Sequence, residues 1–357
     1  MKIAVIPGDG IGPEVMEQAL TVLDTLQQLD QTLEIETMTF QWNSDYYLQT
    51  GRMMPEDGLE TLAQYDAILF GAIGDARVPD DVTVWELIMP IRKQFQQYVN
   101  FRPVKSLPGI ASPLATKEAI DFVIFRENTE GEYSNSGGRL YGGTEHELAI
   151  QNTVMTKVGI NNIVSAACDY ALKYKKSTVT SATKSNAVIH TMKFWDAIVH
   201  ETMSRYPQLQ LKSYYIDALV AYFVERPEEF EVVVASNLFG DILSDLGSAI
   251  IGGLGLSPSG NINPNRAYPS MFEPVHGSAP DIAGLGIANP IAQIWSLALL
   301  LGHVGRPDLE QLIVQAIEQV LTKSEVKTAD IGGTATTQQM GEAICYALKN
   351  CYEMRGV

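Results

Sequence analysis

The chain has 357 residues, which is too long for one ordinary hydrophobic core, so two domains are expected. Its composition, 46% hydrophobic and 19% charged, is that of a globular protein. The net charge of −17 counts against a protein that binds nucleic acid or an anionic membrane, because either would need a basic face.

The cysteines and the N-terminus predict a cytoplasmic location. Three cysteines without metal-ligand spacing make no disulfide framework, which indicates a reducing compartment. The chain opens directly into a strand pattern, with no basic-then-apolar leader. No apolar stretch reaches the length of about 18 residues that a membrane span needs. The three cysteines are Cys168, Cys345 and Cys351.

The first thirty residues contain a glycine-rich turn between a strand and a helix. Residues 2–6 predict a buried strand, Pro7–Glu14 the turn, and the apolar periodicity from Val15 a helix. This order is typical of a Rossmann dinucleotide site, but the spacing is G-x-G-x-G rather than G-x-G-x-x-G. Pro13 suits the first position of a helix instead. The motif therefore does not favour a Rossmann fold.

Strands and helices continue to alternate in the next hundred residues. Residues 67–70 predict a strand, and residues 82–95 predict a helix that Pro90 interrupts. Residues 98–102 read as extended, and the strand 122–125 leads into an arginine. This alternation predicts the α/β class.

The second half begins with irregular segments and returns to the same alternation. Residues 133–143, rich in Gly, Ser and Asn, predict a loop, and residues 147–156 alternate like a β-arm. The glycine-rich segment 252–260 breaks the pattern and is a candidate crossover between domains. From Asn289 onward the periodicity is helical.

The stretch 236–246 carries a pair of acidic residues on a predicted helix. It follows the apolar run 232–235, which predicts a buried strand, and its leucines and isoleucine recur every four residues as one apolar stripe. Asp241 and Asp245 are also four residues apart, so their carboxylates share another face of the helix. Such a pair suits Mg²⁺, although two solvated aspartates would show the same spacing.

Three arginines stand at the ends of predicted elements. Guanidinium groups bind carboxylates in bidentate fashion, although each of these arginines alone could form a surface ion pair. Ligands of open α/β sheets bind at strand ends. Arginines and paired aspartates there suggest a polyanionic substrate bridged by a metal. The arginines are Arg92, Arg102 and Arg126.

Five motifs together resemble one enzyme family, the β-decarboxylating dehydrogenases of isocitrate, 3-isopropylmalate and tartrate or D-malate. They occur in order over nearly the whole chain, and each would be weak alone. The motifs are Pro7–Glu14, Arg126–Tyr133, Thr183–Asn186, Asn237–Asp245 and Glu273–Gly284.

The resemblance implies a two-domain, non-Rossmann α/β fold like that of isopropylmalate dehydrogenase, with open mixed sheets flanked by helices. Residues 1–98 and 253–357 would form a discontinuous cofactor domain. Residues 99–252 would form the domain for substrate, metal and dimerisation. The resemblance also implies a homodimer with shared active sites and a small diacid substrate.

The same resemblance assigns roles in oxidative decarboxylation. Asp241, Asp245 and Asp217 of the second subunit would hold Mg²⁺ or Mn²⁺. Lys184 of the second subunit, with Asp217, would remove the proton of the 2-hydroxyl group. Tyr133 would be the general acid that protonates the enol carbon after CO₂ leaves. The three arginines would clamp the substrate carboxylates.

The implied cofactor is NAD. Asp281 would accept hydrogen bonds from the ribose hydroxyls and repel a 2′-phosphate. The similar NADP-dependent isocitrate enzymes carry Lys-Tyr where Asp281-Ile282 stands here. K⁺ is a further candidate cofactor. The residues assigned to the cofactor are Glu273, His276, Gly277, Ser278, Ala279, Asp281, Ile282 and Asn289.

The substrate is suggested by the residues before Arg92. A tryptophan like Trp85 occurs in the tartrate and D-malate enzymes, and it could fill the volume that an isopropyl group needs. Glu86 would repel the third carboxylate of isocitrate. D-malate or tartrate is therefore favoured, although Glu86-Leu87 and Pro90 depart from that subfamily.

Three alternatives stay open beside this interpretation. The apolar pair Ile88-Met89 keeps 3-isopropylmalate or another alkylmalate as a substrate. A non-catalytic regulatory subunit should lack some of the catalytic residues, and none is missing. A conventional Rossmann dehydrogenase would need the other glycine spacing and no metal.

Overall fold

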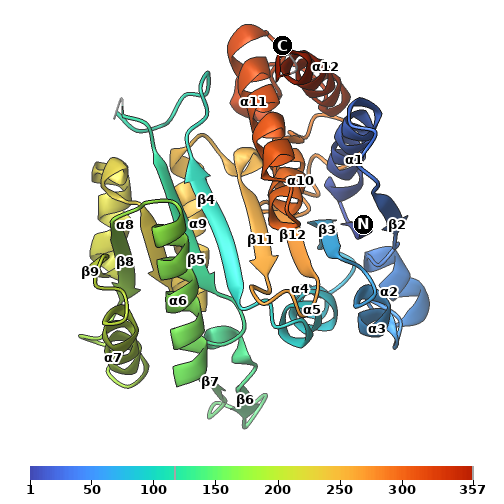
Figure 1. Cartoon of the computed structure of the whole chain (residues 1–357). Helices are drawn as coiled ribbons and strands as arrows, with labels where there is room; N and C mark the ends of the chain where they lie inside the picture. The colour runs from blue at the N-terminus through green and yellow to red at the C-terminus, as the bar shows by residue number, and fades with distance from the viewer. Residues whose placement is uncertain (116–117, 356–357) are drawn as a thin grey trace. The chain divides into compact units, whose positions relative to one another are not determined.

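The computed structural model describes residues 1–115 and 118–355, and the chain divides into two compact units. Unit 1 comprises Met1–Gln97, Lys105–Ala115 and Ser248–Val357, and unit 2 comprises Tyr98–Val104 and Thr116–Gly247. Each unit combines a sheet with helices, so the predicted α/β class is confirmed (Figure 1).

Unit 1 holds the N-terminal elements and the C-terminal helices. Its first part contains β1 (Lys2–Gly8), α1 (Gly12–Leu29), β2 (Glu36–Thr39), α2 (Ser44–Thr50), α3 (Gly58–Leu62), β3 (Ala67–Ala72), α4 (Asp80–Thr83), the π-helix η1 (Val84–Ile88) and α5 (Met89–Gln94). Its second part contains η4 (Leu254–Leu256), β11 (Pro258–Ile262), β12 (Ser270–Pro274), α10 (Ile291–His303), α11 (Pro307–Lys323), η5 (Ala329–Ile331) and α12 (Thr337–Arg355).

The strands of unit 1 follow the order β2-β1-β3-β12-β11. β1 is parallel to β2 and β3, β12 is parallel to β3, and β11 is antiparallel to β12. β1 and β3 are buried along nearly their whole length, which explains their continuous apolar sequences. α10 packs against β3, β11 and β12, and α11 packs against α10 (Figure 1). The antiparallel β11 and this order separate the fold from a Rossmann domain.

The helical run from residue 80 to residue 94 differs from the prediction at Pro90. The prediction placed an interruption there, but the run continues because the preceding turn is a π-helix. The N–H of Met89 bonds to the carbonyl of Val84, five residues back, and Pro90 stands in the first turn of α5. A proline in a helix lacks an N–H and crowds the carbonyl four residues before it, which the wider turn relieves.

Unit 2 holds the middle of the chain. Its elements are β4 (Val99–Lys105), β5 (Asp121–Glu127), η2 (Glu132–Ser134), β6 (Gly137–Leu140), β7 (Leu148–Gln151), α6 (Lys157–Lys173), β8 (Thr178–Thr183), α7 (Thr191–Met203), β9 (Gln210–Tyr215), α8 (Ile216–Glu225), η3 (Pro227–Glu229), β10 (Val232–Ala235) and α9 (Asn237–Ile250). The last residue of β4 and the last three of α9 belong to unit 1.

The strands of unit 2 follow the order β4-β5-β10-β8-β9. β5, β10, β8 and β9 pair in parallel, so their carboxyl ends share one edge. α6 packs against β5, β10 and β8, and α7 packs against α6 (Figure 1). The residues that follow these strands are therefore gathered at a single edge of the sheet.

A β-hairpin stands apart from that sheet (Figure 1). β6 pairs with β7 in antiparallel register, from Gly137 opposite Gln151 to Leu140 opposite Leu148. The predicted β-arm is thus present at residues 148–151. The prediction of an uninterrupted loop over residues 133–143 was wrong, because residues 137–140 form the partner strand.

α9 is present where a helix was predicted, but its buried side is not the predicted stripe. Leu243 and Ser244 are buried, whereas Ile242 is 49% exposed and Leu238 and Leu246 are only partly buried. The apolar stripe therefore lies at the margin of the buried face in a single chain.

None of the helices in the described ranges combines the length and the apolarity that a membrane span requires.

Candidate active site

Two aspartates and two arginines meet beside α9 in unit 2. Nη1 of Arg126 lies 2.5 Å from Oδ1 of Asp241. Nη1 of Arg102 lies 3.8 Å from Oδ1 of Asp241 and 3.8 Å from Oδ1 of Asp245. The arginines are almost fully buried, and the Asp245 side chain is 61% exposed. Guanidinium groups therefore offset the like charges on this helical turn.

The sheet edge and an asparagine hold Arg126 in place. Arg126 is near the carboxyl end of β5, and its Nε donates to Oδ1 of Asn237 at 2.9 Å. Nδ2 of Asn237 donates to the carbonyl of Glu130 at 2.9 Å. Gly240 permits the close approach, because a Cβ there would lie 2.6 Å from Cβ of Arg126. Asn237 belongs to a quoted motif and was predicted only as a candidate cap for the helix start, without a role in the site.

Tyr133 and Ser244 complete this cluster. The Tyr133 hydroxyl donates to Oδ2 of Asp241 at 3.2 Å, and the Arg126 guanidinium lies 5.6 Å from the centre of the Tyr133 ring. Nη1 of Arg102 donates to Oγ of Ser244 at 2.5 Å. Ser244 was not predicted, although its position between the two aspartates could have indicated it.

Lys184 and Asp217 form a separate pair in unit 2. Lys184 follows β8, Asp217 follows β9 in the first turn of α8, and Nζ of Lys184 lies 2.7 Å from Oδ1 of Asp217. The hydrogen bond from Lys184 holds the pKa of Asp217 below its usual value. Lys184 also lies 5.7 Å from the centre of the Tyr215 ring.

The third predicted metal ligand, Asp217, was expected from a second subunit, and one chain does not place it beside Asp241 and Asp245. Within residues 1–115 and 118–355, no cluster of three or more His, Cys, Asp or Glu side chains could hold a metal ion. Asp241 and Asp245 still fit a Mg²⁺ or Mn²⁺ site, because such ions often take one or two carboxylates and complete their shell with water or substrate oxygens.

Among the predicted cofactor residues, Glu273 lies in β12, and the others lie on the loop segment between β12 and α10 in unit 1. The loop packs tightly on the turn after β1, where the N–H of Ile11 donates to the carbonyl of Ser278 at 2.8 Å. Gly10 has a φ of +57°, and a Cβ there would lie 2.0 Å from the same carbonyl. The backbone of the N-terminal glycine motif thus packs against the backbone of this loop. Within the loop, Ala279 has a positive φ of 41°.

One side chain of this region, His276, has a polar atom that is open to a ligand. Nε2 of His276 is buried and has no hydrogen-bond partner among the described residues, and burial lowers the pKa of the ring. Asn289 donates from Nδ2 to Asp330 at 3.0 Å. Asp330 lies about forty residues beyond Asn289 in the chain, so no local motif pointed to it. An orphaned imidazole nitrogen fits a nucleotide, which has many polar atoms.

Asp281 is exposed, and Ile282 packs beside a small apolar cluster formed by Ile11, Val15 and Ala288. Ser278 and Gly277 complete the loop, with Gly277 exposed and Ser278 buried. The predicted discriminating aspartate is therefore accessible, and its neighbour anchors the loop.

The remaining predicted substrate residues lie near α5 in unit 1. Nη2 of Arg92 lies 2.7 Å from Oε1 of Glu273, which also accepts from Nδ2 of Asn261 at 2.6 Å. Nε of Arg92 is buried and has no partner among the described residues. Trp85 stands on the π-helix and is half-buried. Asn261, like Asp330, was not predicted.

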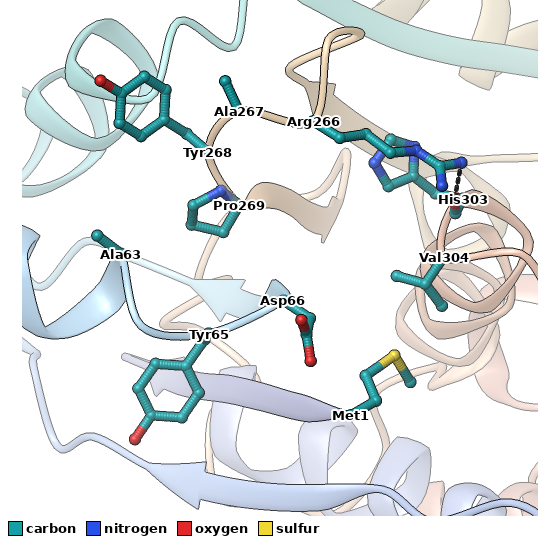
Figure 2. Close-up of a pocket in the computed structure, with 10 residues that line it drawn as sticks. All are labelled: Met1, Ala63, Tyr65, Asp66, Arg266, Ala267, Tyr268, Pro269, His303 and Val304. Atoms are coloured by element: carbon teal, nitrogen blue, oxygen red, sulfur yellow. Dashed lines mark hydrogen bonds between the residues drawn. The ribbon is translucent and has the colours of Figure 1, made fainter.

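A cavity of about 490 Å³ lies elsewhere in unit 1, at the amino ends of β1, β3 and β12 (Figure 2). Met1, Asp66 and Pro269, which precede these strands, line it together with Arg266 and His303. Figure 2 shows Arg266 turned toward the end of α10, where it donates to the His303 carbonyl. None of the predicted site residues lines this cavity.

Comparisons with known proteins identify the family. The family description for isocitrate/isopropylmalate dehydrogenase matches residues 2–344. The chain is 50% identical to tartrate dehydrogenase/decarboxylase of Pseudomonas putida, over 96% of each chain. It is 49% identical to decarboxylating D-malate dehydrogenase of Escherichia coli K12, over 97% of this chain and 98% of that one.

A solved structure agrees with these relatives. The crystal structure of isocitrate dehydrogenase from Methylococcus capsulatus superposes with a TM-score of 0.89 at 32% identity, and it covers 98% of this chain and 99% of that one. The chain belongs to the isocitrate/isopropylmalate dehydrogenase family.

Proposed function

We propose that this protein is an NAD- and divalent-metal-dependent enzyme that oxidises and decarboxylates D-malate, tartrate or both. The observation that carries the proposal is the cluster at α9, where Arg102, Arg126 and the Tyr133 hydroxyl surround the carboxylates of Asp241 and Asp245. The identity of about one half to a tartrate and a D-malate enzyme supports the reaction type.

The protein's own groups would divide the work as follows. Arg92, Arg102 and Arg126 would bind and orient the substrate carboxylates. Lys184, with Asp217, takes the proton of the 2-hydroxyl group. Tyr133 delivers a proton to the carbon that loses CO₂.

A metal ion held by Asp241, Asp245 and Asp217 of a second copy would polarise the hydroxyl oxygen and offset the charge that develops on it. NAD would accept the hydride. The residues assigned to the cofactor lie in unit 1, and the unsatisfied Nε2 of His276 and the exposed Asp281 support that assignment. K⁺ remains a candidate as an additional cofactor.

Two domains and two copies are part of the proposal. The cofactor domain comprises residues 1–98 and 253–357, and residues 99–252 form the domain for substrate, metal and dimerisation. The two compact units support this division. Exposed apolar side chains of unit 2 support a dimer, because such a group usually marks an interface. They include Leu140, Tyr141, Ile150, Val188, Ile189 and Ile242.

The burial of the residues after Trp85 supports a small substrate. Met89 is 2% exposed, and Ile88 packs against the core of unit 1. Both side chains are therefore engaged in packing. This pair was the reason to keep an alkylmalate as an alternative substrate, but it has little freedom to line a pocket for an isopropyl group. The location we propose is the cytoplasm, which the three free thiols support.

An assay of NADH formation tests this function. The purified protein is supplied with NAD, Mn²⁺ and one of D-malate, the tartrates, 3-isopropylmalate or isocitrate. We expect turnover of D-malate or tartrate, with loss of activity in EDTA and recovery on adding Mn²⁺. A large preference for 3-isopropylmalate would contradict the substrate assignment, and full activity in EDTA would contradict the metal mechanism.

A further inference from the structure

The helical run that carries Trp85 also carries a lysine that contacts its ring. Nζ of Lys93 lies 5.0 Å from the centre of the Trp85 ring. A cation at this distance from an indole is attracted by the negative face of the ring. Trp85 is half-buried and Lys93 is exposed, so the contact lies at the surface of unit 1.

The π-helix explains why these two residues meet. Eight positions separate them, which in a regular α-helix would place the side chains about 80° apart around the axis. A π-turn takes up about one additional residue, so the offset falls to about 20° and the two side chains lie on one face. Pro90 favours that turn, because a regular helix would crowd its ring against the carbonyl of Glu86.

We infer that Lys93 is a positioning residue that fixes the Trp85 indole and thereby sets how strongly the enzyme rejects 2-hydroxy diacids with an alkyl group at C3. The inference rests on the proposed function and on the sequence-based expectation that Trp85 fills the volume of such a group. A half-buried indole without its cation can adopt other side-chain rotamers, and the space it fills becomes available to a larger substrate.

The test compares kcat/KM for D-malate and for 3-isopropylmalate in the full protein with NAD and Mn²⁺. Lys93→Met keeps the apolar stem and removes the charge, and we expect the D-malate to 3-isopropylmalate ratio to fall about threefold, the size that a partly exposed cation–π contact supports. Lys93→Arg keeps a cation and should retain the ratio. Trp85→Ala should lower the ratio about tenfold or more. In a protein that already carries Trp85→Ala, the second change Lys93→Met should not alter the ratio further.

A matched control and a second readout separate positioning from a general effect. Lys173 lies 5.1 Å from the centre of the Tyr174 ring in unit 2, and Lys173→Met should leave the ratio unchanged. Acrylamide quenching of tryptophan fluorescence reports mainly on Trp85, because Trp42, Trp195 and Trp295 are at most 6% exposed. Quenching should increase in Lys93→Met and stay near the wild-type level in Lys93→Arg.

Two outcomes would overturn the inference, and they can be told apart. If Trp85→Ala changes the ratio but Lys93→Met does not, Lys93 does not position the ring and the proposed pocket stands. If Trp85→Ala leaves the ratio unchanged, both this inference and the assignment of Trp85 to the substrate pocket are wrong.

Discussion

Asp245 shows how the charges at α9 balance one another. Partial burial raises the pKa of its carboxyl group, the Arg102 guanidinium opposes that shift, and the carboxylate of Asp241 adds to it. Asp241 itself is in direct contact with Arg126. The arginines thus stabilise two negative charges on one helical turn. A diacid substrate that binds the same guanidinium groups would leave the carboxylates of Asp241 and Asp245 available to a cation.

Asp281 offers a sharp test of the cofactor assignment. The double substitution Asp281→Lys with Ile282→Tyr removes an acceptor for the ribose hydroxyls and adds a cation for a 2′-phosphate. Loss of a hydrogen bond to a charged group costs about 1.5–3 kcal/mol. We therefore expect the NAD to NADP ratio of kcat/KM to fall at least about tenfold, which corresponds to about 1.4 kcal/mol.

The two cofactors are compared in parallel assays with D-malate and Mn²⁺. Asp57→Lys, a change of the same charge at the N-cap of α3, where the side chain makes no capping hydrogen bond, serves as the control and should leave the ratio unchanged. An unaltered ratio in the double variant would rule out Asp281 as the discriminating residue.

At the scale of elements, α9 depends on close packing against β5. Glycine in a helix interior is worse than alanine by about 1 kcal/mol, so Gly240→Ala should stabilise an isolated helix. In the folded protein the new Cβ would lie 2.6 Å from side-chain atoms of Arg126, and overpacking of this kind costs about 1–3 kcal/mol. The clash should outweigh the gain in helix propensity.

We therefore expect Gly240→Ala to lower the midpoint of thermal unfolding and to raise the KM for D-malate, because Arg126 must move. Gly138→Ala is the control, since a Cβ at that position meets nothing within 4 Å. A variant with wild-type stability and an unchanged KM would show that α9 has more room than the structure indicates.

The elements also show what a sequence pattern can predict. Continuous apolar runs located β1, β3, β5 and β10, because these strands are buried on both faces. Local patterns did not indicate the π-helix, which accommodates Pro90. They also did not indicate β6, because its sequence Gly-Gly-Arg-Leu has little strand preference of its own and pairs with β7.

The same limit applies to the site. Asp241 and Asp245 were found because their spacing is local, and Arg126 because it ends a strand. Asn237 and Ser244 escaped notice because their roles come from contacts with Arg126 and Arg102, which are more than a hundred residues away in the chain. Pairings of this kind are a property of the fold.

At the scale of the whole molecule, the account requires two copies of the chain. The described part of one chain brings Asp241 and Asp245 together and leaves Lys184 bound to Asp217 in a separate pair. The proposed reaction needs a base beside the metal, so we propose that the pair is supplied by a second copy. Exposed apolar residues on unit 2, among them Ile189 and Ile242, offer the surface for that association.

The most direct test mixes two inactive variants, Lys184→Met and Asp241→Asn, under conditions that allow subunits to exchange. In a mixed dimer one site receives Asp241 from the first chain and Lys184 from the second, so mixing should restore about a quarter of the wild-type NADH formation from D-malate. Each variant alone, and a protein that carries both substitutions in every chain, should stay inactive. If subunit exchange is verified by mass spectrometry and the mixture remains as inactive as its components, the shared active site is contradicted.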